Sequence, residues 1–220
     1  MCFPLTSIHK KQIVAATGLL LILFVIVHLL GNLVIYMGPE AFNAYAKKLA
    51  SLKQIRILAE LGLGAIFLTH IYFTALLVHE NVKARGGAQR YAVDQAVGQR
   101  SLFTRLMPIS GLYIFGFVIW HILDFTLIDH HGVRSMINGI SYGVYGVVVN
   151  AFKDPVHSSL YIIAVIFLGM HLAHGCQSVV QTFGLEQARS GKRFIVFSRI
   201  TGFLVAFGFT SIPLYVLFIL

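Results

Sequence analysis

The stretch FLGMHLAHGCQSVVQTFG, residues 167–184, decides how this chain folds. It lies inside a run of 31 residues, 155–185, that contains no charged side chain. About 20 such residues are enough to cross a bilayer as a helix. Yet the run carries His171 and His174, and Ser178 lies on the same helical face as His171. A polar side chain at mid-membrane is costly, so these histidines indicate a functional site inside a membrane helix.

Four more uncharged runs have the length of a membrane span. With the first, they predict helices near residues 13–37, 55–80, 104–128, 157–183 and 199–219. Charged residues make up 11% of the chain, against about 25% in soluble domains. The sequence therefore predicts an all-α fold, an integral membrane bundle of five transmembrane helices that forms a single domain over residues 1–220.

Three apolar segments need a separate interpretation. The first run resembles a signal peptide, but it is too long for one and is expected to stay as a helix. Residues 135–152 hold three glycines and two asparagines, and we expect a folded surface excursion with a short helix at the interface. Apolar residues recur in the first loop at helical spacing, which predicts an amphipathic helix on the membrane surface: they are Ala41, Tyr45, Leu49 and Leu52.

The basic residues set the expected orientation. With five spans and the N-terminus inside, the inner segments hold 11 lysines and arginines and the outer segments hold 6. Basic residues concentrate on the cytoplasmic side of membrane proteins. The N-terminus is therefore expected in the cytoplasm and the C-terminus outside, and the net charge of +9 needs no nucleic acid as a partner. The inner loop at residues 80–104 is long enough to contact a soluble protein.

Each of four successive spans carries a histidine near its middle. Helices one and three run outward, which places His28 and His121 in the outer half of the membrane. Helices two and four run inward, which places His70 and His171 in the inner half. At 1.5 Å per residue the two levels lie roughly 10 Å apart. Two imidazole pairs at two depths predict two six-coordinate haems, one above the other, whose iron has no open site for substrate and so transfers electrons.

Other residues receive weaker roles. We expect Gly31, one turn from His28, to make room for a macrocycle, and His174 and Ser178 to contact the haem pocket. His174 also competes with His171 as a ligand. Asp124 is expected at the outer surface, with proton handling as an alternative. Solvation or contact with a propionate is enough for the remaining histidines, which lie at helix ends or in loops: His9, His79, His130, His131 and His157.

Several chemistries have no motif in this sequence. There is no CxxCH, so a haem would be held without thioether bonds. There is no GxGxxG, phosphate-binding loop, CxxC pair or nucleophile elbow. Cys2 at the terminus and Cys176 in a span are not expected to form a disulfide. The sequence thus predicts no catalytic residue of its own, and any FAD, iron–sulfur or dicarboxylate chemistry belongs to other subunits.

The motifs resemble a known family. The pieces are HLLGNL at 28–33, AFNAY at 41–45, SLFTRLMPISG at 101–111 followed by WHILDF, and HLAHGCQSVVQTFGL at 171–185. They resemble the single-chain, five-helix, di-haem b558 cytochrome b subunit of succinate dehydrogenase/fumarate reductase (respiratory complex II). The resemblance implies two b haems, with His28, His70, His121 and His171 as iron ligands. It also implies a menaquinone or other quinone substrate, and cytoplasmic flavoprotein (FAD) and iron–sulfur partner subunits in a bacterial inner membrane.

One departure from this family concerns proton movement. Some relatives have a glutamate two residues before the fourth ligand, implicated in moving protons across the membrane. Here that position is Gly169, so the sequence gives no carboxylate for such a path. Two rival interpretations stay open: the di-haem anchor of a formate dehydrogenase or hydrogenase, and a non-redox bundle in which the histidines only pack.

Overall fold

A computed structural model describes residues 5–84, 102–184 and 191–220. Five helices are long and apolar enough to cross a membrane. They are α1 (Ser7–Asn32), continued by the 3-10 turn η1 (Leu33–Met37); α3 (Lys53–Ala84); α4 (Leu102–His121), continued by the π turn η2 (Ile122–Thr126); α6 (Pro155–Thr182); and α7 (Gly191–Ile219). The predicted all-α membrane bundle of five spans is confirmed. Most boundaries lie within four residues of those expected, but α1 begins six residues earlier and α7 eight residues earlier.

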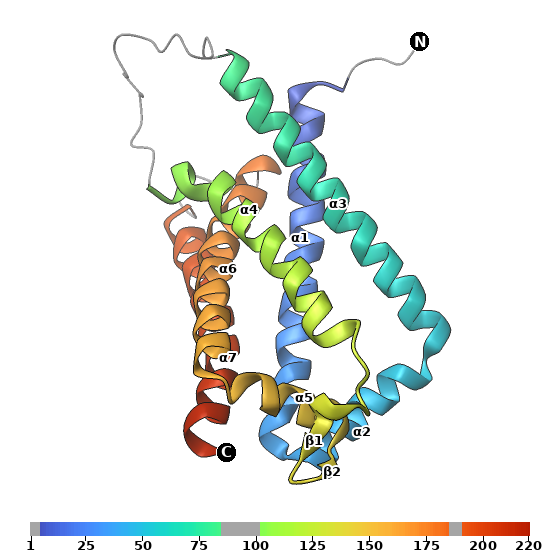
Figure 1. Cartoon of the computed structure of the whole chain (residues 1–220). Helices are drawn as coiled ribbons and strands as arrows, with labels where there is room; N and C mark the ends of the chain where they lie inside the picture. The colour runs from blue at the N-terminus through green and yellow to red at the C-terminus, as the bar shows by residue number, and fades with distance from the viewer. Residues whose placement is uncertain (1–4, 85–101, 185–190) are drawn as a thin grey trace.

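The spans alternate in direction, so the two chain ends lie at opposite faces of the bundle (Figure 1). We call these the N-side and the C-side. An ion pair between Lys10 and Glu80 joins the start of α1 to the end of α3 at the N-side. The loop at residues 80–104, expected to contact a soluble partner, lies mostly outside the described residues.

Smaller elements close the C-side. They are α2 (Pro39–Ser51), the 3-10 turn η3 (Val133–Ser135), the hairpin of β1 (Met136–Ile137) and β2 (Ile140–Ser141), and α5 (Gly143–Phe152). The helix expected after the first span is confirmed as α2. The side chain of Asn43 ties α2 to α5, because its Nδ2 donates to the Tyr142 carbonyl at 2.7 Å and its Oδ1 accepts from the Tyr145 N–H at 3.1 Å.

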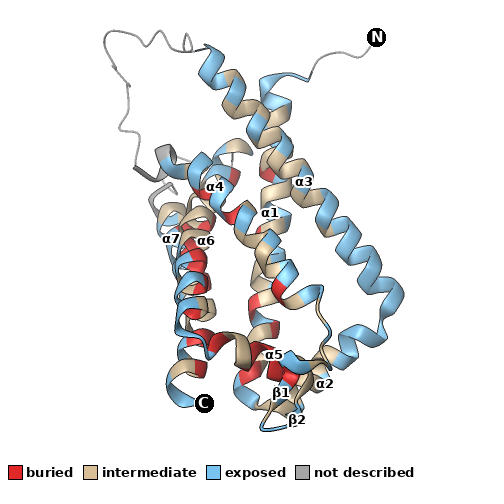
Figure 2. Ribbon diagram, in the orientation of Figure 1, coloured by how far each residue is buried: buried red, intermediate tan, exposed pale blue. Residues whose placement is uncertain are grey.

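Residues 135–152 do not form a span, as expected, but the prediction of a surface excursion is wrong for α5. Figure 2 shows this short helix mostly buried. Tyr145, Val149 and Phe152 are at most 7% exposed and belong to the main apolar cluster. The cause is the closure by α2 and the hairpin, which shields an apolar segment too short to cross the bilayer.

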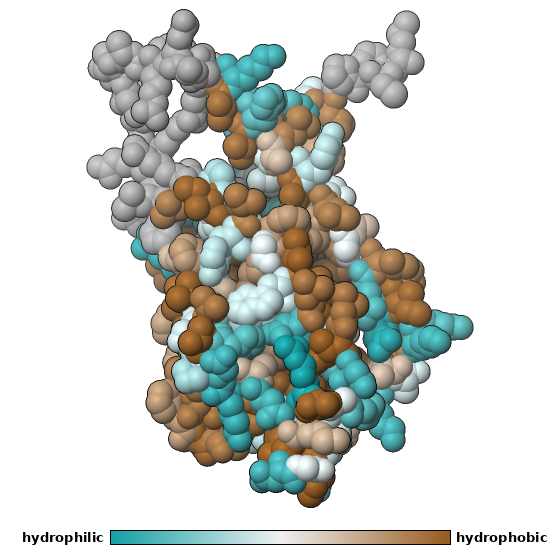
Figure 3. Space-filling model, viewed as in Figure 1, coloured by the Kyte–Doolittle hydropathy of each residue, from teal (hydrophilic) through white to brown (hydrophobic). Residues whose placement is uncertain are grey.

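The helices differ in how far they are buried within the chain. Among the helix pairs, α6 and α7 have the most extensive contact. Helix α3 has no buried residue (Figure 2). Apolar side chains such as Leu61 and Leu68 on α3 are more than 60% exposed. On the face seen in Figure 3, hydrophobic residues spread over the middle and hydrophilic ones gather toward the ends. Such a surface fits a hydrocarbon surrounding between two polar interfaces.

Candidate haem-ligand site

His28 on α1 and His121 at the end of α4 face each other toward the C-side, as the sequence predicted. Their ring centres lie 5.8 Å apart, and the ring planes meet at 83°. We call them the C-side pair. Aromatic rings surround the pair with centres 5.4 to 6.1 Å from one imidazole or the other; they belong to Phe24, Phe117, Phe125, Tyr161 and Phe209.

This geometry fits two ligands of one iron. A metal–imidazole bond is about 2 Å long, so two imidazoles on opposite sides of a metal place their ring centres roughly 6 Å apart. The Nδ1 atom of His121 is buried and has no hydrogen-bond partner among the described residues. A buried polar atom without a partner is costly and calls for an explanation such as an unseen ligand.

The other two histidines, His70 on α3 and His171 on α6, form the N-side pair. Each ring meets a hydroxyl of the neighbouring helix: Thr17 Oγ1 lies 3.0 Å from His70 Nδ1, and Ser110 Oγ lies 3.0 Å from His171 Nδ1. Sequence analysis missed both hydroxyls, although each is followed directly by a glycine.

The distance between the two pairs along the bundle can be obtained from residue spacing on α1 and, independently, on α4. On α1, Gly18 is beside His70, and His28 follows ten residues later. On α4, Gly111 is beside His171, and His121 also follows ten residues later. Ten residues of helix rise about 15 Å. The two pairs therefore occupy distinct depths, somewhat farther apart than the sequence predicted.

The lesser predicted contacts are placed as follows. His174 is half-buried and lies one turn from His171 on α6. Ser178 is exposed. Gly31 is buried because Tyr45 of α2 packs against it, where a Cβ atom would overlap the Tyr45 hydroxyl. Close packing of α2 thus accounts for this glycine directly.

Asp124 was expected at the outer surface, and that prediction is wrong. Its side chain is 6% exposed. One carboxylate oxygen, Oδ2, lies 2.6 Å from His157 Nε2 and accepts from the Tyr161 hydroxyl at 3.0 Å. The other, Oδ1, accepts from Arg134 Nη1 at 3.1 Å. His157 is likewise not a solvated side chain but a partner of this carboxylate, next to a pocket of about 230 Å³. The π turn η2 directs Asp124 inward, and helical periodicity does not predict such a turn.

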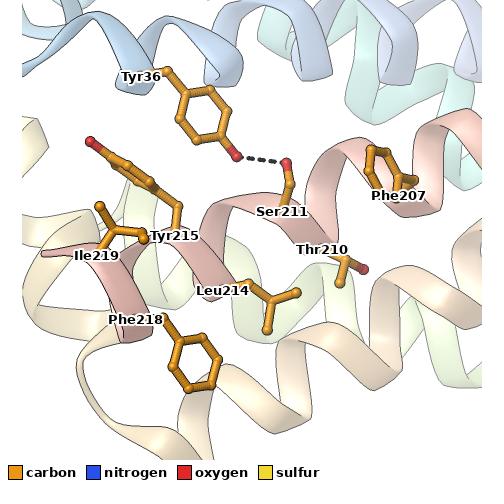
Figure 4. A pocket seen from close by; sticks show the side chains of 8 residues that line it. All are labelled: Tyr36, Phe207, Thr210, Ser211, Leu214, Tyr215, Phe218 and Ile219. Atoms are coloured by element: carbon orange, nitrogen blue, oxygen red, sulfur yellow. Dashed lines mark hydrogen bonds between the residues drawn. The ribbon is translucent and has the colours of Figure 1, made fainter.

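A second pocket, of about 420 Å³, lies between η1 and α7 near the C-side (Figure 4). The Tyr36 hydroxyl donates to Ser211 Oγ at 2.6 Å, and Tyr215 stacks edge-on against Tyr36. The remaining lining is almost entirely apolar. Since these two hydroxyls bond to one another, the pocket is an open apolar groove rather than a polar binding site.

In the described parts of the chain, no three histidine, cysteine, aspartate or glutamate side chains gather to hold a metal ion. An iron between two imidazoles needs only two such side chains, which is the arrangement of the C-side pair. The buried hydroxyl of Thr74, one turn from His70, has no partner among the described residues. The donor sets at both depths thus fit axial haem ligation.

Comparison with known proteins gives one relative. The chain is 26% identical over 171 residues to the succinate dehydrogenase cytochrome b558 subunit of Bacillus subtilis (strain 168), covering 78% of this chain and 77% of that one. No protein-family model and no solved structure matches the chain. The aligned part is large enough to include most of the bundle. The chain is therefore similar to a succinate dehydrogenase cytochrome b subunit, which confirms the resemblance read from its motifs.

Proposed function

We propose that this chain is the membrane-anchor di-haem cytochrome b subunit of a succinate:quinone oxidoreductase. It would pass electrons between an iron–sulfur subunit and membrane quinone. The observation that carries the proposal is the meeting of His28 and His121 in an aromatic surrounding, with a second histidine pair about 15 Å away along the bundle. The similarity to a succinate dehydrogenase cytochrome b558 subunit supports the choice of complex.

Each pair is assigned one b haem. His28 and His121 would hold the outer haem, and His70 and His171 the inner haem. A haem held by two imidazoles supplies one-electron transfer, with its potential set by ligand hydrogen bonds and burial. The protein's own part is to fix the four rings at two depths and to exclude water from them.

The excess of basic residues in the N-side segments supports a cytoplasmic N-terminus and an external C-terminus. A flavoprotein with FAD and an iron–sulfur subunit would then bind at the N-side, next to the inner haem. The chain would lie in a bacterial cytoplasmic membrane, with menaquinone or another quinone as its substrate and a higher oligomer of the complex as an open possibility. Dicarboxylate chemistry in the tricarboxylic acid cycle would take place on the flavoprotein, since this chain has no catalytic motif for it.

A reduced-minus-oxidised spectrum of the purified complex tests the ligand assignment. We expect a b-type band from two haems in the wild type. His171→Ala should remove about half of it, because one of two irons loses an axial ligand. His174→Ala is the matched control, since it changes a half-buried histidine one turn away on the same helix. We expect it to keep both haems.

Two results would contradict the proposal. A wild-type complex without a b-type band would leave only the packing interpretation of the histidines. Loss of haem in His174→Ala with retention in His171→Ala would show that His174, and not His171, is the iron ligand. Co-purification with a covalent-flavin subunit would separate succinate chemistry from a formate dehydrogenase or hydrogenase anchor.

A further inference from the structure

Two matching dipeptides cradle the imidazoles of the N-side pair. Thr17 and Gly18 on α1 face His70, and Ser110 and Gly111 on α4 face His171. In each case the hydroxyl contacts Nδ1, and the glycine lies against the ring atom Cε1. The same arrangement, a hydroxyl at Nδ1 and a glycine beside Cε1, thus occurs on two different helices.

The hydroxyl protons are already donated elsewhere. Thr17 Oγ1 donates to the Ile13 carbonyl at 2.7 Å, with the Val14 carbonyl at 3.1 Å as a second acceptor. Ser110 Oγ donates to the Met107 carbonyl at 3.1 Å. A hydroxyl has a single proton to give and two lone pairs with which to accept. A hydroxyl that gives its proton to its own helix in this way can only accept from the imidazole.

The direction of this hydrogen bond sets the tautomer of both rings. If the hydroxyl accepts, the proton of the neutral imidazole is on Nδ1, and the lone pair is on Nε2. The Nε2 atoms point away from these acceptors and have no hydrogen-bond partner among the described residues. An imidazole in this state is ready to bind a metal through Nε2.

The glycines complete the cradle by leaving room for the ring. A Cβ atom on Gly18 would lie 3.2 Å from His70 Cε1, which is too close unless the ring shifts. A Cβ atom on Gly111 would lie 3.5 Å from His171 Cε1, an ordinary contact. The hydroxyl therefore sets the ring's tautomer, and on α1 the glycine also sets the ring's position.

In the described part of the chain, the imidazoles of the C-side pair have no such hydroxyl at Nδ1. His121 Nδ1 has no partner in the described part of the chain. His28 meets only the amide nitrogen of Asn32, at 3.3 to 3.4 Å from its two ring nitrogens. The amide nitrogen is a donor, so it cannot accept a ring proton. The two histidine levels thus differ in the hydrogen bonds that reach their rings.

We propose that Thr17 and Ser110 are positioning residues that hold His70 and His171 with Nδ1 protonated and Nε2 free for iron, and that they lower the reduction potential of the inner haem. This rests on the proposed function. A hydrogen bond accepted from Nδ1–H makes the imidazole a more basic ligand. A more basic ligand stabilises the oxidised iron over the reduced iron, so loss of the bond raises the potential.

A redox titration of the purified complex, followed by optical and low-spin EPR spectra, tests this. In Ser110→Ala both haems should stay bound. At a fixed ambient potential, the ratio of reduced to oxidised inner haem should rise by less than about fivefold, because the bond is present in both redox states and only part of its net free energy, about 1 kcal/mol, separates them. The outer haem should titrate as before. Ser159→Ala is the matched control, because Ser159 also donates to its own helix, at 2.7 Å to the Pro155 carbonyl, but is exposed.

Variants of Thr17 test the other ring if Ser110→Ala fails to assemble. Thr17→Val should shift the inner haem in the same direction, because valine has the shape of threonine but no hydroxyl. Thr17→Ser should restore the wild-type titration because it keeps the hydroxyl. Gly18→Ala should change the EPR signal of the inner haem, whereas Gly111→Ala should not.

The outcomes separate this inference from the proposed function. If both haems are bound and neither Ser110→Ala nor Thr17→Val moves the inner titration, the positioning role is wrong while the di-haem assignment stands. If the shift appears in the outer haem instead, the pairing of hydroxyls with histidines is wrong. If the wild-type complex holds no haem, the proposed function itself fails.

Discussion

Gly202→Ala is expected to prevent α6 and α7 from packing in their observed positions. A Cβ atom on Gly202 would overlap the carbonyl oxygen of Gly169 and lie 2.8 Å from Ala173 Cβ. Gly169 is equally tight, since its Cβ would lie 2.6 Å from the Gly202 carbonyl oxygen. Both contacts involve backbone atoms, which cannot move aside separately. Small residues allow membrane helices to approach this closely, and packing of this kind holds them together in lipid.

The expected cost of Gly202→Ala is about 1–3 kcal/mol, the usual range for overpacking a filled interior. It should appear as a lower midpoint of thermal inactivation of the purified complex and as partial loss of haem. Gly62→Ala is the matched control, because a Cβ atom there has no neighbour within 4 Å. An alanine in an open helical position is neutral or slightly stabilising. Equal stability of both variants would mean that α6 and α7 do not cross at these glycines.

The same contact explains a departure from the family pattern. The position where some relatives carry a glutamate is Gly169, and it is closed off by α7. Gly169→Glu should therefore fail to assemble rather than supply a proton path. Recovery of an intact complex with this change would show that α7 can move away.

Asp124→Ala is the second change with a large expected effect. It removes the acceptor of three donors, His157, Tyr161 and Arg134. Leaving a buried donor without its acceptor costs about 1–3 kcal/mol. His157 and Tyr161 lose theirs here, whereas the Arg134 side chain is 59% exposed and stays solvated. The network joins the end of α4 to the start of α6, so its loss loosens the helix end that carries His121.

We therefore expect Asp124→Ala to lower the thermal midpoint and to lose the outer haem before the inner one. The measurement is the haem content of the purified complex, resolved by redox titration, together with thermal inactivation. Asp129→Ala is the control in the same loop, since Asp129 is exposed and caps only the His131 N–H. Loss of the inner haem first would contradict the placement of Asp124 beside the C-side pair.

The spans could be predicted because burial in lipid leaves a direct mark on composition, a long run without charge such as residues 155–185. The depth of the four histidines followed from helix rise and alternating direction. The burial of α5 could not be predicted, because residues 135–152 are as uncharged as a span and only the closure by α2 and the hairpin decides their position. The environment of Asp124 depends on the π turn η2, which has no signal in helical periodicity. Threonine and serine are common in membrane helices, so only the contacts of Thr17 and Ser110 with histidines of other helices distinguish these two residues.

Helices α1 and α4 each contribute to both depths. α1 provides His28 at one level and Thr17 at the other, and α4 provides His121 and Ser110 in the same way. Helices α3 and α6 each contribute one imidazole of the N-side pair, and α6 also places Tyr161 beside His121 at the other level. Sliding either α1 or α4 along its axis by one turn would put both imidazole levels out of register together. A change in α1, α4 or α6 that suits one imidazole level is therefore constrained by the other level, whereas α3 contributes His70 to the N-side pair.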